Sequence, residues 1–427
     1  MAEILFAALF VLMALGVPVA FAMAIAVFLS LNFASSYPDI VVVKEMFSGL
    51  DSFPLLAVPF FILAAELMTG GMITLILLRV AAQFVGHLRG GLGYANVISS
   101  TLFAGISGSA LADAAGPGAM MVRMMEKGGF DKSYAGALTI ASAVVGPIIP
   151  PSIVMIIYAM QDDAVSVGSL FMAGIVPGLV LTCGTLVANW YVSRKRDYRS
   201  AELRPSRREM LRTSIKAVPA LFLIVLIVGG IRFGIFTPTE ASVIAVFYAL
   251  LCGMFIYRTL KLVHLPPIIL RAALISAAVL LILGAARAFA WILIIEGVPQ
   301  LLAETIISWD LSPLMFLLAV NLLLLVFGLF MDPLPGVMIL VPILAPISHV
   351  MGIDPNHFAI VVIVNLTLGL TTPPVGSLIF VVSSTVNLRP SALIREMPPF
   401  FIASLTVLLL LTFLPFLSTW LPRASGF

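Results

Sequence analysis

The feature that most constrains this chain is a pattern of helix-breaking residues that occurs twice, at an offset of 223 residues. Six pairs of positions are identical at this offset: Gly105 and Gly328, Gly129 and Gly352, Asp131 and Asp354, Gly146 and Gly369, Pro150 and Pro373, and Pro151 and Pro374. Most of these residues interrupt helices, and most lie within apolar sequence. The pattern therefore predicts a duplicated unit whose helices are broken, as in secondary transporters built from repeats.

The surrounding sequence is apolar enough to cross a membrane many times. Of the 427 residues, 61% are hydrophobic and 10% are charged, which lies far outside the soluble globular range. A helix needs about 20 apolar residues to cross a bilayer. The sequence predicts spans at 3–31, 52–84, 133–160, 168–192, 215–232, 239–257, 268–296, 356–388 and 398–421. We therefore expect an all-α integral membrane protein without a soluble domain.

Two further apolar blocks, 92–127 and 311–350, contain Gly, Pro and Ser near their middles, and their flanking charges differ. The first block is flanked by Arg89, Arg123, Lys127 and Lys132, whereas no Lys or Arg occurs between Arg287 and Arg389. Because cytoplasmic loops carry an excess of Lys and Arg, both ends of the first block should lie in the cytoplasm and both ends of the second outside. We expect two re-entrant helical hairpins in an inverted-topology repeat.

Basic residues are concentrated in the loop 194–216, between the two copies. They are Arg194, Lys195, Arg196, Arg199, Arg204, Arg207, Arg208, Arg212 and Lys216. The positive-inside rule explains this loop as cytoplasmic, and we expect no nucleic-acid partner. The first basic residue of the chain is Lys44, so we do not expect a cleavable signal at the N-terminus.

These observations predict five regions. A transmembrane helix and interfacial arm occupy 1–51, and the first inverted repeat occupies 52–193, with hairpin 92–127 and broken helix 133–160. The basic loop 194–216 and scaffold helices at 217–263 follow. The second repeat occupies 264–427, with hairpin 311–350, broken helix 356–388 and last helix 398–421. The two helices are expected to be unwound at their Pro-Pro pairs, because proline lacks an N–H donor and clashes with the preceding turn.

The hairpin tips and the helix breaks carry the candidate chemistry. Irregular backbone at membrane depth costs several kcal/mol per unsatisfied group unless it lines a cavity or binds something. If each tip meets a break, free carbonyls gather with the side chains of Ser107, Ser109, Asp332, Thr371 and Thr372. Hard oxygen donors without His or Cys suit Na⁺ better than a transition metal. Taken one at a time, each Pro is most simply explained as a helix kink and each Gly or Ser as a packing contact. The occurrence of the whole arrangement in both copies favours a binding role instead.

At these residues the sequence resembles the large membrane subunit of tripartite ATP-independent periplasmic (TRAP) transporters over nearly the whole chain. The matching motifs are FPLLAVP at 53–59, ELM at 66–68, GHLRGG at 86–91, LFAGISGSA at 102–110, ADA at 112–114, GPIIPPS at 146–152, GIFTPTEA at 234–241, EGVPQ at 296–300 and TPPVG at 372–376. One departure is DPLPG at 332–336, where the family often has small residues after Asp-Pro.

The resemblance implies a Na⁺-driven importer of an organic acid, such as a sialic acid or a C4-dicarboxylate, in a bacterial inner membrane. It implies two partners: a periplasmic binding protein that delivers the solute, and a small four-helix membrane subunit. The hairpins and broken helices would form an elevator-type transport domain that moves against a scaffold. It also implies one Na⁺ site at Ser107, Ser109 and the carbonyls of Gly146, Ile149 and Pro151. A second site is expected at Gly328, Asp332, Thr371 and Thr372. No cofactor and no enzymatic activity are expected.

The organic anion needs a counter-charge, and Arg287 is the only strong cation deep in a predicted span. We favour carboxylate binding by Arg287 over a buried pair with Glu296 or snorkelling toward an interface. Ser142 and Asn365 occupy equivalent positions before the two breaks; they could bind solute or form interhelical hydrogen bonds. Ser152, beside the first Pro-Pro pair, is a further candidate for solute binding.

Simpler roles are expected for other polar residues. Glu66 should form a scaffold contact or subunit interface, and Asp113 should brace the first hairpin. Asp162 and Asp163 are expected in a solvated loop. Asp131 and Asp354 are expected to be N-caps of the helices that follow them. Cys183 and Cys252 are expected to be small buried thiols.

Two other functions compete with this interpretation. Residues 105–108, Gly-Ile-Ser-Gly, match the pattern of rhomboid-type intramembrane serine proteases, but such chemistry needs a base near the serine and no His is predicted at bilayer depth. The second alternative is a stand-alone Na⁺- or H⁺-coupled carrier of a dicarboxylate or oxyanion, which would work without a binding protein.

Overall fold

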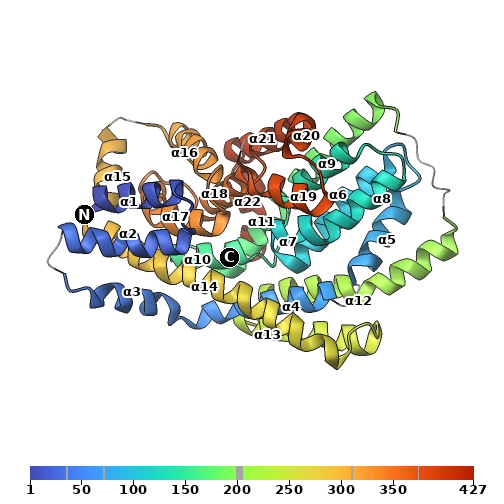
Figure 1. Ribbon diagram of the computed structural model, residues 1–427, viewed down its shortest axis with the longest axis horizontal. Coiled ribbons are helices and arrows are strands. Elements are labelled where there is room, and N and C mark those ends of the chain that lie inside the picture. Colours follow the sequence, from blue (N-terminus) through green and yellow to red (C-terminus); the bar gives the residue numbers. More distant parts are fainter. Residues whose placement is uncertain (35–36, 71–72, 199–204, 309–310, 374) are drawn as a thin grey trace.

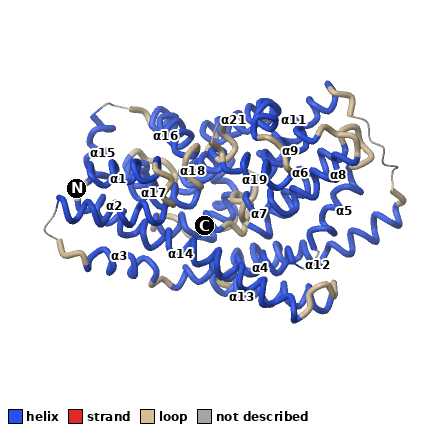
Figure 2. Tube along the Cα trace, viewed as in Figure 1, coloured by secondary structure: helices blue, strands red, loops and turns tan. Residues whose placement is uncertain are grey.

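The protein is all-helical, and no strand occurs in the part of the chain that the structure describes (Figures 1 and 2). The computed structural model describes residues 1–34, 37–70, 73–198, 205–308, 311–373 and 375–427. The elements are α1 (Ala2–Ala14), α2 (Val19–Ala34), α3 (Ile40–Leu50), η1 (Phe53–Leu56), α4 (Ala57–Gly70), α5 (Ile73–Val85), α6 (Gly91–Ser107), α7 (Ala110–Asp113), η2 (Ala114–Gly118), α8 (Ala119–Lys127), α9 (Lys132–Ala143), α10 (Ile153–Gln161), α11 (Val167–Lys195), α12 (Arg207–Arg232), α13 (Pro238–Leu251), η3 (Cys252–Ile256), η4 (Leu262–His264), α14 (Leu265–Ile295), α15 (Val298–Ser308), α16 (Pro313–Gly328), α17 (Pro333–Val350), α18 (Pro355–Gly369), α19 (Ser377–Val386), α20 (Pro390–Glu396), α21 (Pro398–Phe413) and α22 (Phe416–Ala424).

Several helices have the length and composition of membrane spans. Among the described residues, five helices are each long and apolar enough to cross a membrane. The number rises to eight if each bent pair of helices counts as one span. Two expected continuous spans are corrected. The span 3–31 is two helices, α1 and α2, because Gly16 takes a left-handed φ of 82° and Pro18 cannot continue a helix. The last span bends by 61° between α21 and α22, next to Pro415.

The helices repeat in the same order at the sequence offset. The pairs that correspond are α6 and α16, α8 and the second half of α17, α9 and α18, and α10 and α19. The first residues of α9 and α18, Lys132 and Pro355, differ by 223 residues. As predicted, Asp131 and Asp354 cap these two helices. The Asp131 carboxylate accepts from the N–H of Ser133 and Tyr134, and the Asp354 carboxylate accepts from the N–H of Asn356 and His357. The duplication therefore extends from the sequence to the local structure.

Each copy packs its broken helix against the hairpin of the other copy. The half-helix α10 lies on α17, and α19 lies on α8, η2 and α9. Helix α11 packs against α21, α22 and α18, so it joins the two copies through the centre of the molecule. In Figure 1 the helices α6 and α8 lie in the right half of the view and α16 and α17 in the left half. The corresponding helices of the two copies therefore lie in opposite halves of this view.

A second layer of helices lies along the lower edge of Figure 1, where α3, α4, α12, α13 and α14 are labelled. Helix α14 contacts α2, α3 and α4 as well as α17, so it joins this layer to the second hairpin. Glu66 on α4 pairs with Arg271 on α14 at 3.9 Å, which is a contact within this layer as expected. Cys252 is buried as expected, but Cys183 on α11 is exposed, contrary to expectation.

The expected loop at 194–216 is largely helical at both ends. Helix α11 continues to Lys195 and α12 begins at Arg207, so much of the basic sequence extends two helices. Arg199 and Arg204 of the predicted loop lie outside the described residues. A salt bridge of 2.5 Å between Arg196 and Glu396 fixes the end of α11 to the second copy.

Candidate functional site

The first hairpin tip touches the first helix break. Helix α6 ends at Ser107, Gly108 takes a left-handed φ of 60°, and α7 starts after Ser109. A Cβ placed on Gly108 would lie 2.6 Å from the carbonyl oxygen of Pro151. A Cβ on Gly146 would lie 3.0 Å from the carbonyl carbon of Ser109. Only glycine permits such close approach of two backbones, so these residues form a first tip–break junction.

The polar groups of this first junction are only partly satisfied. The Ser107 hydroxyl donates to the Oδ1 of Asp113, and the Ser109 N–H donates to the Ser107 Oγ at 3.2 Å. The other carboxylate oxygen of Asp113, Oδ2, is buried and has no hydrogen-bond partner. It lies 2.9 Å from the Cβ position of Gly146, so it faces the break. A buried acceptor without a donor is costly, and such a group is a candidate contact for a cation.

The break itself leaves carbonyl groups without hydrogen bonds. Helix α9 ends at Ala143 and α10 begins at Ile153. The carbonyl oxygens of Gly146, Ile149 and Pro151 accept no hydrogen bond from the described residues. The Ser152 hydroxyl donates to the carbonyl of Pro147 at 2.5 Å and caps α10. The structure therefore brings Ser107, Ser109, Gly146 and Pro151 to the first junction, and Ile149 lies in the same break. The Ser152 hydroxyl is occupied by the Pro147 carbonyl and by the first turn of α10.

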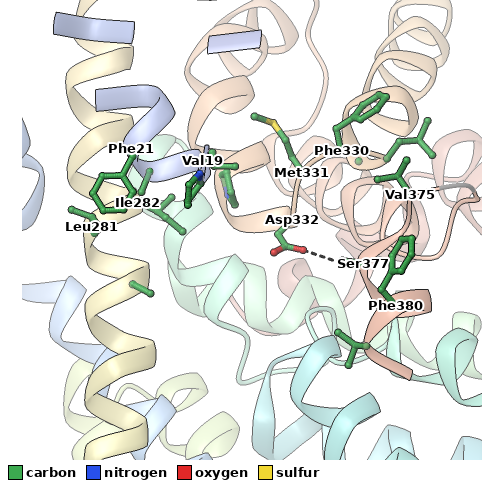
Figure 3. Close-up of a pocket in the computed structure, with 17 residues that line it drawn as sticks. Val19, Phe21, Leu281, Ile282, Phe330, Met331, Asp332, Val375, Ser377 and Phe380 are labelled. Atoms are coloured by element: carbon green, nitrogen blue, oxygen red, sulfur yellow. Dashed lines mark hydrogen bonds between the residues drawn. The ribbon is translucent and has the colours of Figure 1, made fainter. Parts of the chain in front are cut away.

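The second junction has the same construction. A Cβ on Gly369 would lie 2.4 Å from the Cα of Gly328, so the end of α16 and the end of α18 meet through glycine backbones. The Asp332 carboxylate accepts a hydrogen bond of 3.1 Å from the Ser377 hydroxyl, across the break (Figure 3). The hydroxyls of Thr371 and Thr372 both donate to the carbonyl of Leu368, at 2.8 and 3.1 Å. Pro374 of this break lies outside the described residues.

A cavity of about 680 Å³ opens beside the second junction. Gly328, Asp332 and Ser377 line it on one side, and the first turn of α2 and part of α14 line it on the other (Figure 3). Asp332 points into a mostly apolar space between Phe21 and Phe380. Thr371 and Thr372 do not line this cavity. Of the four residues predicted for the second site, Gly328 and Asp332 line the cavity, and Asp332 is the one with a carboxylate.

Ser142 and Asn365 form interhelical hydrogen bonds. The Ser142 hydroxyl lies 2.9 Å from the Ser100 hydroxyl, which joins α9 to α6. Asn365 donates to the side-chain oxygen of Asn321 at 2.7 Å, which joins α18 to α16. In both copies the broken helix is thus tied to the helix that leads to the tip. The interhelical hydrogen bonds expected as one role of Ser142 and Asn365 are therefore present. Solute binding by either residue stays a prediction.

Arg287 does not line the cavity beside the second junction. It lines two cavities, of about 460 and 380 Å³, which share Gln161, Asp163 and Arg287 itself. No carboxylate of the described residues pairs with it, and Glu296 instead pairs with the Met1 ammonium at 2.9 Å. The alternative of a pair between Arg287 and Glu296 is therefore wrong. The guanidinium remains the cation of these two cavities.

The structure corrects two expectations about acidic residues. Asp162 is not solvated: it is 5% exposed and lies 3.3 Å from His349 at the end of α17. Asp163 is exposed, as expected. Asp113 braces the hairpin as expected, but its free Oδ2 adds it to the first junction. Ser377 was missed; its place as the first residue of α19, directly after the break, is the signal that could have found it.

No histidine of the described residues contacts Ser107, whose hydroxyl is bonded to Asp113. His264 contacts Lys261, His349 contacts Asp162, and His357 contacts Ser418. Within the described residues, Ser107 has no hydrogen bond to a histidine, which is the base of a rhomboid-type protease.

Comparisons with known proteins agree with this architecture. The family model of the tripartite ATP-independent periplasmic transporter, DctM component, matches residues 6–417. The sialic acid TRAP transporter large permease protein of Vibrio cholerae is 37% identical over 408 residues, covering 96% of this chain and 95% of the relative. The C4-dicarboxylate TRAP transporter large permease protein of Pseudomonas aeruginosa is 39% identical over 382 residues, covering 90% and 89%.

A solved structure, that of the Alcanivorax borkumensis YdaH transporter, matches with a TM-score of 0.63 and 16% identity. It covers 88% of this chain and 87% of that chain, and at this identity it supports the fold alone. The family match disfavours both the protease and the stand-alone carrier. From the family model and these relatives, the chain belongs to the large permease component of the tripartite ATP-independent periplasmic transporters.

Proposed function

We propose that this chain is the permease subunit of a Na⁺-coupled importer of an organic acid, working by an elevator mechanism in a bacterial inner membrane. The observation that carries the proposal is the contact between hairpin tip and helix break in both copies, at Gly108 and Pro151 and at Gly328 and Gly369. Such junctions collect carbonyl and side-chain oxygens where two half-helices end. This is the arrangement by which discontinuous helices bind coupling ions in secondary transporters.

The first junction would bind one Na⁺ through oxygen atoms alone. The ligands we assign are the hydroxyls of Ser107 and Ser109 and the carbonyls of Gly146, Ile149 and Pro151. The free carbonyl groups support this, because a bound cation would satisfy acceptors that no N–H reaches. A hard cation with a small charge matches oxygen donors of this kind.

The second junction would bind a second Na⁺ through Gly328, Asp332, Thr371 and Thr372. The two threonine hydroxyls donate to one carbonyl, so their lone pairs remain available. The carboxylate of Asp332 lines the cavity beside the second junction. A cation there would offset the charge that this carboxylate brings into an apolar space.

The elevator step would move the hairpins and broken helices against the lower layer of helices. The cross-packing of α10 on α17 and of α19 on α8 supports one moving body, since it links the two junctions. The cavity between the second junction and α14 supports a boundary between moving and fixed parts at that place. Inversion of the two hairpins across the membrane is supported by their flanking charges, because Lys and Arg flank the first block and none occurs between Arg287 and Arg389.

The solute would be an organic acid whose carboxylate binds Arg287. Relatives are named for sialic acid and for C4-dicarboxylates, and both compounds carry carboxylates. A guanidinium that pairs with no carboxylate among the described residues can form a bidentate contact with such a group. We propose that a periplasmic binding protein delivers the solute and that a small four-helix membrane subunit completes the assembly, as the word tripartite in the family's name indicates.

Transport in proteoliposomes tests the proposal. Purified permease, small subunit and loaded binding protein should import labelled solute only with an inward Na⁺ gradient. Ser109→Ala removes one ligand of the first junction and should raise the Na⁺ concentration for half-maximal uptake by about tenfold to a hundredfold, since a contact with a charged group is worth about 1.5–3 kcal/mol. The control is Thr406→Ala, an exposed hydroxyl that bonds only its own helix. Uptake that continues after the Na⁺ gradient is dissipated would refute Na⁺ coupling.

A further inference from the structure

One end of the α12–α13 pair gathers cations from two distant parts of the sequence. Arg212 and Lys216 lie one turn apart on the first half of α12, and Arg258 and Lys261 follow η3. All four side chains are exposed. The Tyr257 hydroxyl donates to the carbonyl of Lys216 at 2.8 Å, which places the two segments side by side. We call Arg212, Lys216, Arg258 and Lys261 the basic cluster.

No carboxylate of the described chain forms an ion pair with the basic cluster, and the one acidic residue near it in the sequence is Glu209, one turn before Arg212 on α12. None of its four residues forms an ion pair with an acidic side chain in the part that the structure describes. The sequence holds no Asp or Glu between Glu209 and Glu240, or between Glu240 and Glu296. Four neighbouring cations repel each other unless an anion lies among them. The cluster therefore suits an external anionic ligand.

The position of the basic cluster between two candidate spans indicates how deep in the membrane this ligand lies. The candidate span Pro238–Ile256 ends just before Arg258, and the next candidate span, Leu262–Ile295, begins just after Lys261. The connection between them is where the chain leaves the hydrocarbon region and returns to it. Cations at this level lie among lipid headgroups.

Exposed apolar side chains beside the cations also indicate a lipid ligand. Val263 is 82% exposed and Leu262 is 70% exposed, directly after Lys261. On the other side of the connection, Phe255 is 66% exposed. Exposed apolar groups next to Lys and Arg are typical of segments that enter the boundary between headgroups and acyl chains. A soluble anion would use the cations but would leave these apolar groups in water.

We propose that the basic cluster binds the phosphodiester headgroup of an anionic phospholipid, with Leu262 and Val263 against its acyl chains. Arg212 and Lys216 lie on the helix that continues from the basic connection, on the side that the positive-inside rule assigns to the cytoplasm. The cytoplasmic leaflet supplies anionic headgroups, and juxtamembrane cations attract them. The lipid would hold the ends of α12 and α13 at a fixed depth while other helices move. This site is independent of the Na⁺ and solute sites.

Lipid titration of the purified chain tests the site. Fluorescent phosphatidylglycerol, phosphatidylcholine with the same label, and inorganic phosphate are each titrated into the protein in neutral detergent at constant ionic strength. The test variant combines Arg212→Gln, Lys216→Gln, Arg258→Gln and Lys261→Gln. The control, Arg232→Gln, removes an exposed cation at the opposite end of α12. We expect the preference for phosphatidylglycerol over phosphatidylcholine to fall by about tenfold or more in the test variant and to stay unchanged in the control.

A charge-preserving variant separates binding from folding. Arg212→Lys, Lys216→Arg, Arg258→Lys and Lys261→Arg together should keep the lipid preference, with the elution volume and helical circular dichroism of the original chain. An unchanged preference in the glutamine variant would overturn the proposal. So would an equal loss in the Arg232→Gln control. If inorganic phosphate binds as tightly as phosphatidylglycerol, the cluster is a site for a free anion and the lipid assignment is wrong.

Discussion

Adding one methyl group at Gly369 tests whether tip and break touch in the second copy. In Gly369→Ala the new Cβ would lie 2.4, 2.5 and 2.6 Å from the Cα, the carbonyl carbon and the oxygen of Gly328. Non-bonded carbon atoms are normally about 3.5–4.0 Å apart. The two backbones would therefore have to separate by roughly 1 Å. The neighbour is the backbone of buried Gly328 at the end of α16, so no flexible side chain can move aside instead.

The cost of this separation can be worked out from two opposing effects. Overpacking of a buried contact destabilises by about 1–3 kcal/mol. Alanine gains up to about 1 kcal/mol over glycine in a helix interior, and less at Gly369 because it is the last residue of α18. The net loss is about 1–2 kcal/mol of stability. The same shift moves the carbonyls around Thr371, so the Na⁺ concentration for half-maximal uptake should rise by about tenfold or more.

Thermal unfolding and Na⁺-dependent uptake measure the two effects. The purified variant is heated in detergent at one scan rate and followed by tryptophan fluorescence, and a fall of a few degrees is expected. The matched control is Gly229→Ala on α12, where nothing lies within 4 Å of the new Cβ. It should keep or slightly raise the melting temperature. If Gly369→Ala melts and transports like the original chain, the two glycine backbones are not in contact and the reasoning fails.

Three further predictions follow from single side chains. Asp131→Ala removes an N-cap and should cost about 1 kcal/mol in chemical or thermal unfolding, with Asp131→Asn costing much less. Asp332→Asn keeps a group that can accept from Ser377 but removes the charge, so uptake should lose most of its Na⁺ dependence while the melting temperature changes little; retained dependence would contradict the second site. Arg287→Ala should reduce uptake at least tenfold without loss of assembly with the small subunit, whereas normal uptake would exclude it as the carboxylate-binding residue.

The breaks and the caps could be predicted because each depends on local chemistry. Two consecutive prolines remove two N–H donors from an apolar run, so neither α9 nor α18 can continue through 150–151 or 373–374, whatever surrounds them. An Asp before a helical segment accepts from N–H groups two and three residues on, as Asp131 and Asp354 do. The offset in the sequence then places both features twice.

Burial and partners could not be predicted, because they depend on contacts between distant segments. Asp162 follows a polar Gln and precedes a second Asp, which indicates a solvated loop, yet α17 of the other copy brings His349 over it. Ser142 bonds to Ser100 only because α6 lies against α9. The break between α1 and α2 has a local signal in Gly16 and Pro18, but the long apolar run around it favoured a continuous span.

The way the two copies interlock has a consequence for coupling. Helix α10 leaves the first break and packs on α17, the second helix of the other hairpin, while α19 leaves the second break and packs on α8 and η2. Each half-helix is thus attached to one junction by the chain and to the other by packing. Close-packed interiors transmit strain because they contain few voids. A displacement that opens one junction must therefore shift a wall of the other. Binding of one cation would in this way change the free energy of binding the second, without any direct contact between the two sites.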